Sequence, residues 1–250
     1  MISKKSFTDC VKLLMSDVNS IIIKSMAELY HVLNRGVDKR KIFMNDKDYF
    51  RFIHDLFEFN DEDKVLNVDF RFRRPTIDVG RQYIEHKKRE MLVDVLAFCL
   101  MPNHYHLVLS PRVENGIPLF MKKLNGGYSN YFNKKHERTG TLFEGRYKSI
   151  RIESQAHFIH LPYYIHLNPL DMFAPEWREG ELKDYKGSIK FLDSYRWSSH
   201  LDYLGEQNFP SLTNRDFLLE IFGGEKGYQK KLEGYLKDLN MARIRGVALE

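Results

Sequence analysis

Two spacings of hydrophobic residues follow one another along the chain, and the changes between them mark its predicted elements. Apolar residues recur about every 3.6 positions over residues 5–27 and again in NDKDYFRFIHDLFEF (residues 45–59), which predicts two helices. Asn45 or Asp46 is placed to cap the second helix. ELYHVLNRG (residues 28–36) alternates between apolar and polar side chains and ends at a glycine, which predicts a strand followed by a turn.

The middle of the chain combines a charged interruption with the most apolar stretch. Residues 60–90 are charged and weakly periodic, so we expect an inserted hairpin or loop there. MLVDVLAFCLMP (residues 91–102) is almost continuously apolar, which predicts a central strand that is buried on both faces and ends at Pro102. A second strand is expected from His104 onward, and GIPLFMKKLNGGYSNYFNKK (residues 116–135) has the spacing of a helix despite its two glycines.

The remaining segments complete a mixed pattern of strands and helices. FEGRYKSIRIES (residues 143–154) predicts a strand, and SQAHFIHLPYYIHLNP (residues 154–169) predicts a helix that begins at a serine cap and ends before its Asn-Pro pair. Residues 181–250 are expected to be mostly helical. The order strand, helix, strand, strand, helix, strand, helix predicts an α+β fold with helices on one side of an antiparallel sheet.

Composition restricts the environment in which we expect the protein. The 250 residues carry a formal net charge of +5 and the sequence pI is about 9.0, which favours an acidic partner. Cys10 and Cys99 lack the spacing of a metal site or a disulfide framework and indicate a reducing cytoplasm. No stretch approaches the roughly 18 consecutive apolar residues of a membrane span, so we expect a soluble protein that has no membrane partner.

Positive charge is concentrated between residues 121 and 151. The basic residues of this window are Lys122, Lys123, Lys134, Lys135, Arg138, Arg146, Lys148 and Arg151. Glu137 and Glu144 alone oppose them, and aromatic residues interleave with them. Basic side chains neutralise phosphates and aromatic rings stack on unpaired bases, which predicts a nucleic-acid-binding surface. The alternative is a solvated helix face whose aromatic residues belong to the core.

The stretch MPNHYHLVLS places two histidines one residue apart at the start of a predicted strand. Residues two apart share one face of a strand, so His104 and His106 are expected to project side by side. Two imidazoles on one face suit a divalent metal. They equally suit the solvated side of a half-buried sheet, where they would be two polar residues without a ligand.

A second group of reactive side chains lies at the end of the last predicted helix, in PYYIHLNP. Residues four apart share a helical face, so Tyr164 and Asn168 form a pair, with His160 one turn earlier on the same side. Tyr163 points about 100° away and is assigned to the core. Pro162 removes a backbone hydrogen bond and can kink the helix. The alternative for Tyr164 is a tyrosine that packs in the core.

Together these residues fit a nucleophile assisted by a metal. A phenol has an unperturbed pKa of about 10, so it needs a nearby cation to stabilise its anion, and the same cation polarises a phosphoryl group under attack. Mixed nitrogen and oxygen ligation by His104, His106 and the Asn168 oxygen suits Mg²⁺ or Mn²⁺, with phosphate oxygens completing the shell.

Several segments, taken together, resemble the HUH single-tyrosine transposases, and are most similar to the REP-associated tyrosine transposases and relatives of bacterial insertion sequences. They are YHVLNRG, AFCLMPNHYHLVL, MKKLNGGYSNYFNKKHERTGTLFEGRYKS, YIHLNP and YRWSS. The resemblance covers about residues 28–200 and implies a ferredoxin-like domain that cleaves and rejoins single-stranded DNA, often near a hairpin. It places the catalytic domain at residues 28–180, with the charged insertion at 60–90 and helical extensions at 1–27 and 181–250.

On the matching positions the resemblance implies a role for each candidate residue. His104 and His106 would be the metal-binding pair, and Asn168 the third ligand. Tyr164 would attack a phosphodiester to give a 5′-phosphotyrosine and a free 3′-hydroxyl. The covalent link conserves the bond energy, so rejoining needs no ATP. The chain departs from the family pattern in its long N-terminal helix, its charged insertion and the position of Pro162 two residues before the tyrosine.

Three functions are therefore in competition. The first is a Mg²⁺- or Mn²⁺-dependent nuclease and strand transferase that acts on single-stranded or hairpin DNA, as a monomer or homodimer, in the cytoplasm and on the nucleoid when bound to DNA. The second is a domesticated relative that binds hairpins without cutting them. The third is a metallohydrolase that uses a bound water, in which Tyr164 is structural and no covalent protein–DNA species forms.

Overall fold

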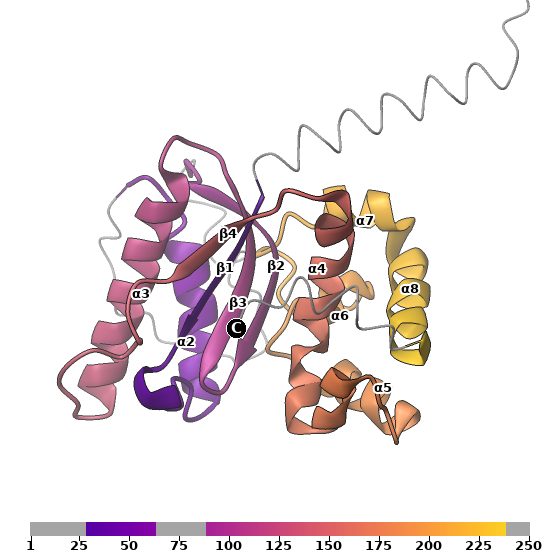
Figure 1. The fold of residues 1–250 in the computed structure, drawn as a ribbon. Coiled ribbons are helices and arrows are strands. Elements are labelled where there is room, and N and C mark those ends of the chain that lie inside the picture. Colours follow the sequence, from indigo (N-terminus) through magenta and orange to yellow (C-terminus); the bar gives the residue numbers. More distant parts are fainter. Residues whose placement is uncertain (1–28, 64–88, 239–250) are drawn as a thin grey trace, which may run out of the picture.

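A four-stranded antiparallel sheet with the strand order β2-β3-β1-β4 forms the centre of the molecule (Figure 1). Its strands are β1 (Tyr30–Arg35), β2 (Val93–Met101), β3 (His104–Pro111) and β4 (Lys148–Arg151). The computed structural model describes residues 29–63 and 89–238. The helix expected at residues 5–27 and most of the insertion at 60–90 lie outside the described residues.

The chain order of these strands and of two connecting helices is that of a ferredoxin-like fold. Helix α2 (Asp46–Glu58) connects β1 to β2, and α3 (Gly116–Lys135) connects β3 to β4. Both helices pack on the same face of the sheet (Figure 1). The predicted α+β, ferredoxin-like class is therefore confirmed.

The C-terminal half covers the other face, so the expectation of helices on one side only is wrong. Helix α4 (Gln155–Leu167) packs against β2 and β3. The elements that follow it are η3 (Asn168–Met172), η4 (Pro175–Glu179), α5 (Tyr185–Ser194), α6 (His200–Tyr203), α7 (Asp216–Phe222) and α8 (Gly224–Asp238). Within the described ranges, no helix has the length and apolar character needed to cross a membrane.

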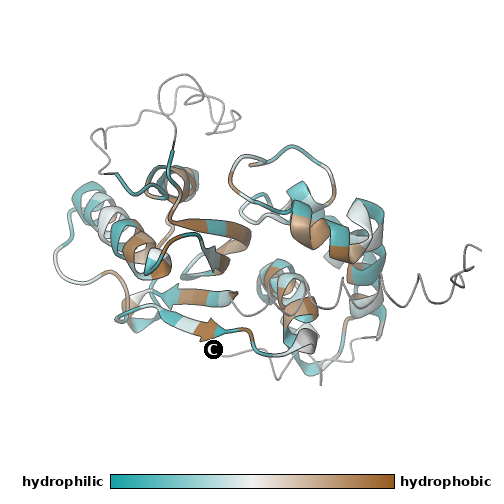
Figure 2. Cartoon of the chain, turned by 90° about the horizontal axis from the view of Figure 1, so that it is seen from above, coloured by the Kyte–Doolittle hydropathy of each residue, from teal (hydrophilic) through white to brown (hydrophobic). Residues whose placement is uncertain are grey.

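Residues that alternate along the strands supply two separate cores. Tyr105 and Leu107 of β3 pack with α2 and α3, whereas Cys99 and Val108 pack on the opposite face with α4 and Trp177. Viewed from above, the hydrophobic sides of the helices turn toward the sheet from both directions (Figure 2). Strands β2 and β3 are therefore buried on both faces, which explains the almost continuous apolar sequence of β2.

Strand β2 lies at the edge of the sheet, so the prediction that it is central is wrong. Its free edge is covered by the segment after α5. The Leu100 N–H donates to the Trp197 carbonyl at 2.8 Å, and the Ser199 N–H donates to the Phe98 carbonyl at 3.0 Å. The Ser199 hydroxyl also accepts from the Phe98 N–H at 2.9 Å. An edge strand covered in this way needs the same apolar composition as a central one.

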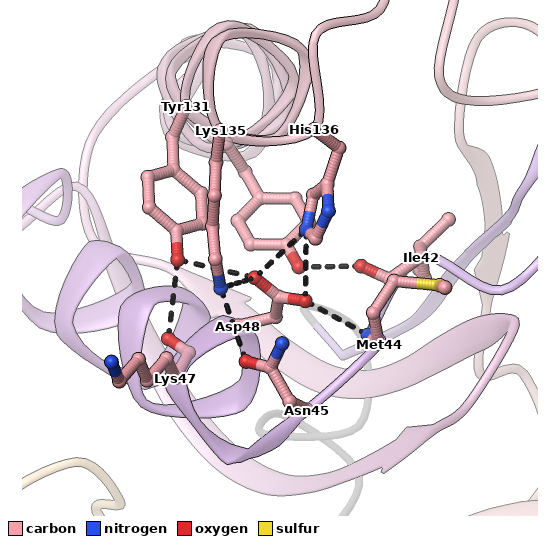
Figure 3. Close-up of polar contacts among 9 residues, drawn as sticks. Ile42, Met44, Asn45, Lys47, Asp48, Tyr131, Lys135 and His136 are labelled. Atoms are coloured by element: carbon pink, nitrogen blue, oxygen red, sulfur yellow. Dashed lines mark hydrogen bonds and ion pairs between the residues drawn. The ribbon is translucent and has the colours of Figure 1, made fainter.

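A buried carboxylate joins the start of α2 to the end of α3 (Figure 3). The side chain of Asp48 is fully buried and accepts hydrogen bonds from the Met44 N–H (2.8 Å), Lys135 Nζ (2.6 Å) and Tyr131 Oη (3.1 Å). Burial alone would raise the pKa of Asp48, but the bonds from Lys135 and Met44 hold it below its ordinary value. Asn45 occupies the N-cap position, yet its side-chain oxygen accepts from Lys135 (3.0 Å) and not from the helix, so the expected cap bond is absent at this described end of α2.

Candidate active site

Two histidines of β3 project from the sheet face that α4 covers. The rings of His104 and His106 lie side by side with centroids 4.9 Å apart, as their spacing predicts. Nδ1 of His104 lies 2.7 Å from Oδ1 of Asn103, and Nδ1 of His106 lies 2.9 Å from Nε2 of His31. Because both Nδ1 atoms are engaged by neighbours, Nε2 is the ring nitrogen through which each histidine would bind a metal.

Burial keeps the imidazoles of His31 and His106 neutral. Burial, with a smaller contribution from His157, lowers the pKa of His31 to about 3. Burial, and then the neighbouring His104 and His31, lower the pKa of His106 well below its ordinary value. Nε2 of His106 is buried and has no hydrogen-bond partner among the described residues. A neutral imidazole with an unpaired ring nitrogen is the form that binds a divalent metal, so His106 fits one.

Helix α4 brings Tyr164 to the same place. The helix begins where Ser154 Oγ accepts from the His157 N–H at 3.1 Å, which confirms the predicted cap, and it continues through Pro162. The ring of Tyr164 lies edge-on to His106 with centroids 6.2 Å apart. Tyr164 is 1% exposed, so it adjoins the histidines from inside the protein.

The neighbours of Tyr164 along α4, Tyr163 and His160, contact helix α8. Tyr163 is buried and stacks on Tyr228 at 5.3 Å, which confirms its assignment to the core. His160 is hydrogen-bonded to the hydroxyl of Tyr235, so its expected place beside Tyr164 is wrong. His160 and Tyr163, three residues apart on α4, both contact Tyr235 of α8, with ring centroids 5.1 and 4.9 Å from it, so His160 shares the side of Tyr163.

Arg178 is a part of the site that the sequence analysis missed. From η4, its Nη1 donates to Tyr164 Oη at 2.7 Å and its Nη2 donates to Asn168 Oδ1 at 2.8 Å. Its Nε and Nη2 donate to the two carboxylate oxygens of Asp171 at 2.8 and 2.7 Å. The guanidinium carbon lies 5.2 Å from the ring centre of Tyr164 and 4.9 Å from that of Trp177.

The Arg178 guanidinium is held in its charged form and is hydrogen-bonded to two atoms of the predicted site, Tyr164 Oη and Asn168 Oδ1. Burial alone would lower the pKa of Arg178, but Asp171 and Tyr164 raise it above its ordinary value. A cationic donor to a phenol oxygen favours the phenolate over the phenol. Asn168 is fully buried, and its Nδ2 donates to the Tyr164 carbonyl at 2.9 Å. Its oxygen accepts from Arg178, and its role as a metal ligand stays a prediction.

A cavity of about 370 Å³ opens beside the histidine pair. His104 and His106 line it together with the basic Arg35, Arg146 and Lys148 and with Asn34, Asn103, Glu144 and Asp171. Among the described residues no three His, Cys, Asp or Glu side chains gather as a metal site. A metal on the histidine pair would therefore need oxygen ligands from an amide or from the substrate. Three cations around such a cavity attract a phosphate.

Arg35 is a further cavity residue that the sequence analysis missed. It pairs with His104 in the register of β1 and β3, and its guanidinium forms two hydrogen bonds of 3.1 Å with Glu144. Strand register brings it beside the histidines from a position 69 residues earlier in the chain. No signal in the local sequence of β1 reveals that proximity.

The eight basic residues predicted to bind DNA do not share one environment: some line the cavity, some bind other parts of the protein and some are exposed. Arg146 and Lys148 line the histidine cavity, and Lys122 lines a neighbouring hollow that also includes Arg146. Lys123 donates to backbone carbonyls of the loop after α2, and Lys135 binds the buried carboxylate at the start of α2. The others are Lys134 and Arg151, both exposed, and Arg138, which bonds to Asn133 at 2.8 Å. Their contact with DNA stays a prediction.

Comparison with known proteins identifies the family. Residues 29–168 match the family model described as "Transposase IS200 like". A solved structure described as that of a REP-associated tyrosine transposase bound to a REP hairpin is similar at a TM-score of 0.45 and 11% identity, covering 74% of this chain and 83% of the other. No curated protein matches the chain. Because the family model spans more than half of the sequence and includes His104, His106 and Tyr164, the chain belongs to the IS200-like transposase family.

Proposed function

We propose that this transposase-family protein is a metal-dependent, single-tyrosine nuclease and strand transferase that acts on single-stranded or hairpin DNA. The observation that supports this function best is the proximity of a tyrosine to two adjacent histidines that line a cationic cavity. The ring of Tyr164 lies 6.2 Å from that of His106, which lies 4.9 Å from that of His104. A phenol, two metal-binding nitrogens and phosphate-binding cations are the groups this chemistry needs.

The cations of the cavity would hold the scissile phosphodiester. Arg35 and Arg146 present guanidinium groups, which match phosphate oxygens in geometry, and Lys148 adds an ammonium. Tyr147 is half-buried next to Arg146, whose guanidinium lies 5.6 Å from its ring centre. An aromatic ring beside a phosphate site can stack on an unpaired base. These features favour a single strand as the substrate.

The proposed reaction exchanges one phosphodiester for another. Tyr164 Oη attacks the phosphorus, a new oxygen–phosphorus bond forms, and the bond from phosphorus to the 3′ oxygen breaks. The phenol proton passes to solvent, and the departing 3′ oxygen takes up a proton, leaving a 5′-phosphotyrosine and a free 3′-hydroxyl. Attack by a 3′-hydroxyl on the phosphotyrosine reverses these steps and rejoins the strand without ATP.

Mg²⁺ or Mn²⁺ bound to His104 and His106 would polarise the phosphoryl group and stabilise the charge that develops on it. The two histidines would hold the ion through Nε2, because Asn103 and His31 engage the Nδ1 atoms. Asn168 would add its oxygen once Arg178 has released it.

The nucleophile must become accessible before it can react. Tyr164 is 1% exposed and is not among the residues that line the cavity. Its oxygen and the Asn168 oxygen are both held by Arg178, which is in turn held by Asp171. Attack on a phosphate in the cavity therefore requires a rearrangement of η3 and η4, the segments that carry Asp171 and Arg178. Entry of an anionic DNA strand would compete with Asp171 for the guanidinium and favour this change.

A gel assay that compares substitutions of two adjacent tyrosines, Tyr163 and Tyr164, tests the proposal. Labelled hairpin and single-stranded DNA is incubated with Mn²⁺ and the protein, then run on a denaturing gel. We expect a covalent adduct that is lost with Tyr164→Phe or with EDTA and kept with Tyr163→Phe. The control is matched because the Tyr163 hydroxyl is buried with no hydrogen-bond partner among the described residues. Cleavage that persists in Tyr164→Phe without an adduct would support the metallohydrolase instead.

The domesticated hairpin-binding relative remains a second candidate because one observation favours it. The atoms that catalysis needs from Tyr164 and Asn168 are both engaged by Arg178 in the buried arrangement described above. If this arrangement persists when DNA is bound, the protein binds without cutting. Hairpin binding that weakens with added salt, together with no adduct across a broad hairpin library, would establish this second function.

A further inference from the structure

We propose that His31 is a positioning residue of the metal site: it accepts the Nδ1–H of His106 and thereby directs the Nε2 lone pair of His106 toward the metal. The inference rests on the metal-binding role proposed above for the histidine pair. It assigns a function to a buried histidine that is not among the residues lining the cavity.

The geometry links these two histidines directly. Nε2 of His31 lies 2.9 Å from Nδ1 of His106, and the ring centroids are 5.1 Å apart. In the antiparallel register of β1 and β3, His106 pairs with Leu33, so His31 reaches it from two residues along the neighbouring strand. His31 is 1% exposed and His106 is fully buried, so solvent does not compete for this bond.

Only one of the two nitrogens in this contact can carry the hydrogen, because each neutral imidazole has one N–H and one lone pair. If His106 donates from Nδ1, its Nε2 is a lone pair that can bind a metal. If His31 donates from Nε2, then Nε2 of His106 carries a hydrogen and cannot bind one. The direction of a single hydrogen bond thus decides whether the metal site is competent.

Without a metal, the two directions of the hydrogen bond between His31 and His106 have similar free energies. Nδ1 of His31 and Nε2 of His106 are both buried with no hydrogen-bond partner among the described residues. Each arrangement therefore leaves one buried donor and one buried acceptor unpaired. Binding of a metal at Nε2 of His106 removes one of these unpaired groups in the first arrangement only, so the metal selects that arrangement.

A purely structural role does not explain His31. A buried polar group without a partner costs about 1–3 kcal/mol, and an apolar side chain on this sheet face would avoid that cost. The core side chains that β2 and α4 contribute on this side of the sheet, such as Ala97, Cys99 and Ile165, are apolar or weakly polar. His157 of α4 is the titratable group that acts electrostatically on His31 from the helix packed above it.

Metal affinity provides the first test. Free Mn²⁺ is measured by electron paramagnetic resonance during titration of the full-length protein, without DNA. His31→Leu removes the acceptor and should weaken Mn²⁺ binding by about 10- to 100-fold, the usual effect of losing such a partner. His31→Gln retains an acceptor oxygen and should bind more tightly than His31→Leu. His54→Leu is the matched control, because His54 is equally buried on α2, across the sheet, and should bind like the wild type.

A second measurement needs no substitution and so does not depend on a variant that folds. Nitrogen-15 spectra of the imidazoles, recorded with diamagnetic Zn²⁺ as the probe, report which ring nitrogens carry hydrogen. We expect hydrogen on Nδ1 of both His31 and His106 in the metal-bound protein. Hydrogen on Nε2 of His31 would overturn the inference, because His31 would then be the donor.

The outcomes separate this inference from the proposed function. Wild-type protein that binds Mn²⁺ with an affinity equal to that of His31→Leu would overturn the role of His31 and leave the metal site standing. Wild-type protein that binds neither Mn²⁺ nor Zn²⁺ would overturn the metal site itself, and the inference with it. Weaker binding by His31→Leu, with unchanged binding by His54→Leu, would support both.

Discussion

Replacement of Arg178 by methionine is the most informative perturbation of the site's stability. The guanidinium makes two hydrogen bonds to the Asp171 carboxylate and one each to Asn168 and Tyr164, all between 2.7 and 2.8 Å. Removing one partner of a buried ion pair costs about 3–5 kcal/mol. The side chains of Arg178 and Asp171 are 25% and 29% exposed, so water can partly solvate the orphaned carboxylate and reduce the cost to about 3 kcal/mol.

A loss of this size is large enough to measure by thermal or guanidinium denaturation. For a chain of this length it corresponds to a decrease in Tm of roughly 6–12 °C. Arg112→Met is the matched control, because Arg112 bonds to Asp94 at the same 2.8 Å but is 47% exposed, and should cost less than about 1 kcal/mol. Equal effects of the two substitutions would refute the account of Arg178 as the residue that secures Tyr164 and Asn168. A double-mutant cycle with Asp171→Asn should give a coupling energy of about 1–3 kcal/mol.

Three further predictions concern the frame that supports the site. Asp48→Asn should lower the free energy of unfolding by about 3 kcal/mol in urea titrations, because it removes the fully buried partner of a lysine. Burial lowers the pKa of His166 well below its ordinary value, so below about pH 6.5 the unfolded chain binds a proton that the folded chain does not. The free energy of unfolding should therefore decrease as the pH is lowered below about 6.5, by up to about 1.4 kcal/mol per pH unit. The decrease should be less steep in His166→Gln. Gly126→Ala should stabilise α3 by up to about 1 kcal/mol, because nothing beyond the adjacent residues and the helix's own backbone lies within 4 Å of the added Cβ. Gly127→Ala should destabilise the protein, because its Cβ would lie 2.4 Å from the Phe59 ring, and the reverse order of stabilities in denaturation would contradict this packing.

Local sequence patterns predicted the parts of the site that lie within one element. The two-residue spacing of His104 and His106 places both on one face of β3, and the four-residue spacing of Tyr164 and Asn168 places both near the end of α4. The bounds of α3 follow from its apolar spacing alone. Such patterns hold because a single strand or helix fixes its own side-chain directions.

The parts that the sequence did not reveal depend on contacts between elements. His31 reaches His106 through the register of β1 and β3, which no local pattern encodes. Arg178 reaches Tyr164 through a short 3-10 turn in a segment without periodicity. The apolar composition of β2 predicts burial correctly but not position, because the segment around Trp197 covers an edge strand as completely as another strand would.

The central claim is that Tyr164 forms a covalent bond to DNA, and peptide mapping of the protein–DNA species tests it most directly. The protein is incubated with Mn²⁺ and hairpin DNA, digested with protease and nuclease, and analysed by mass spectrometry. The account predicts a 5′-phosphonucleotide on the phenol oxygen of Tyr164. A nucleotide on any other residue, or cleaved DNA with an unmodified Tyr164, would contradict it.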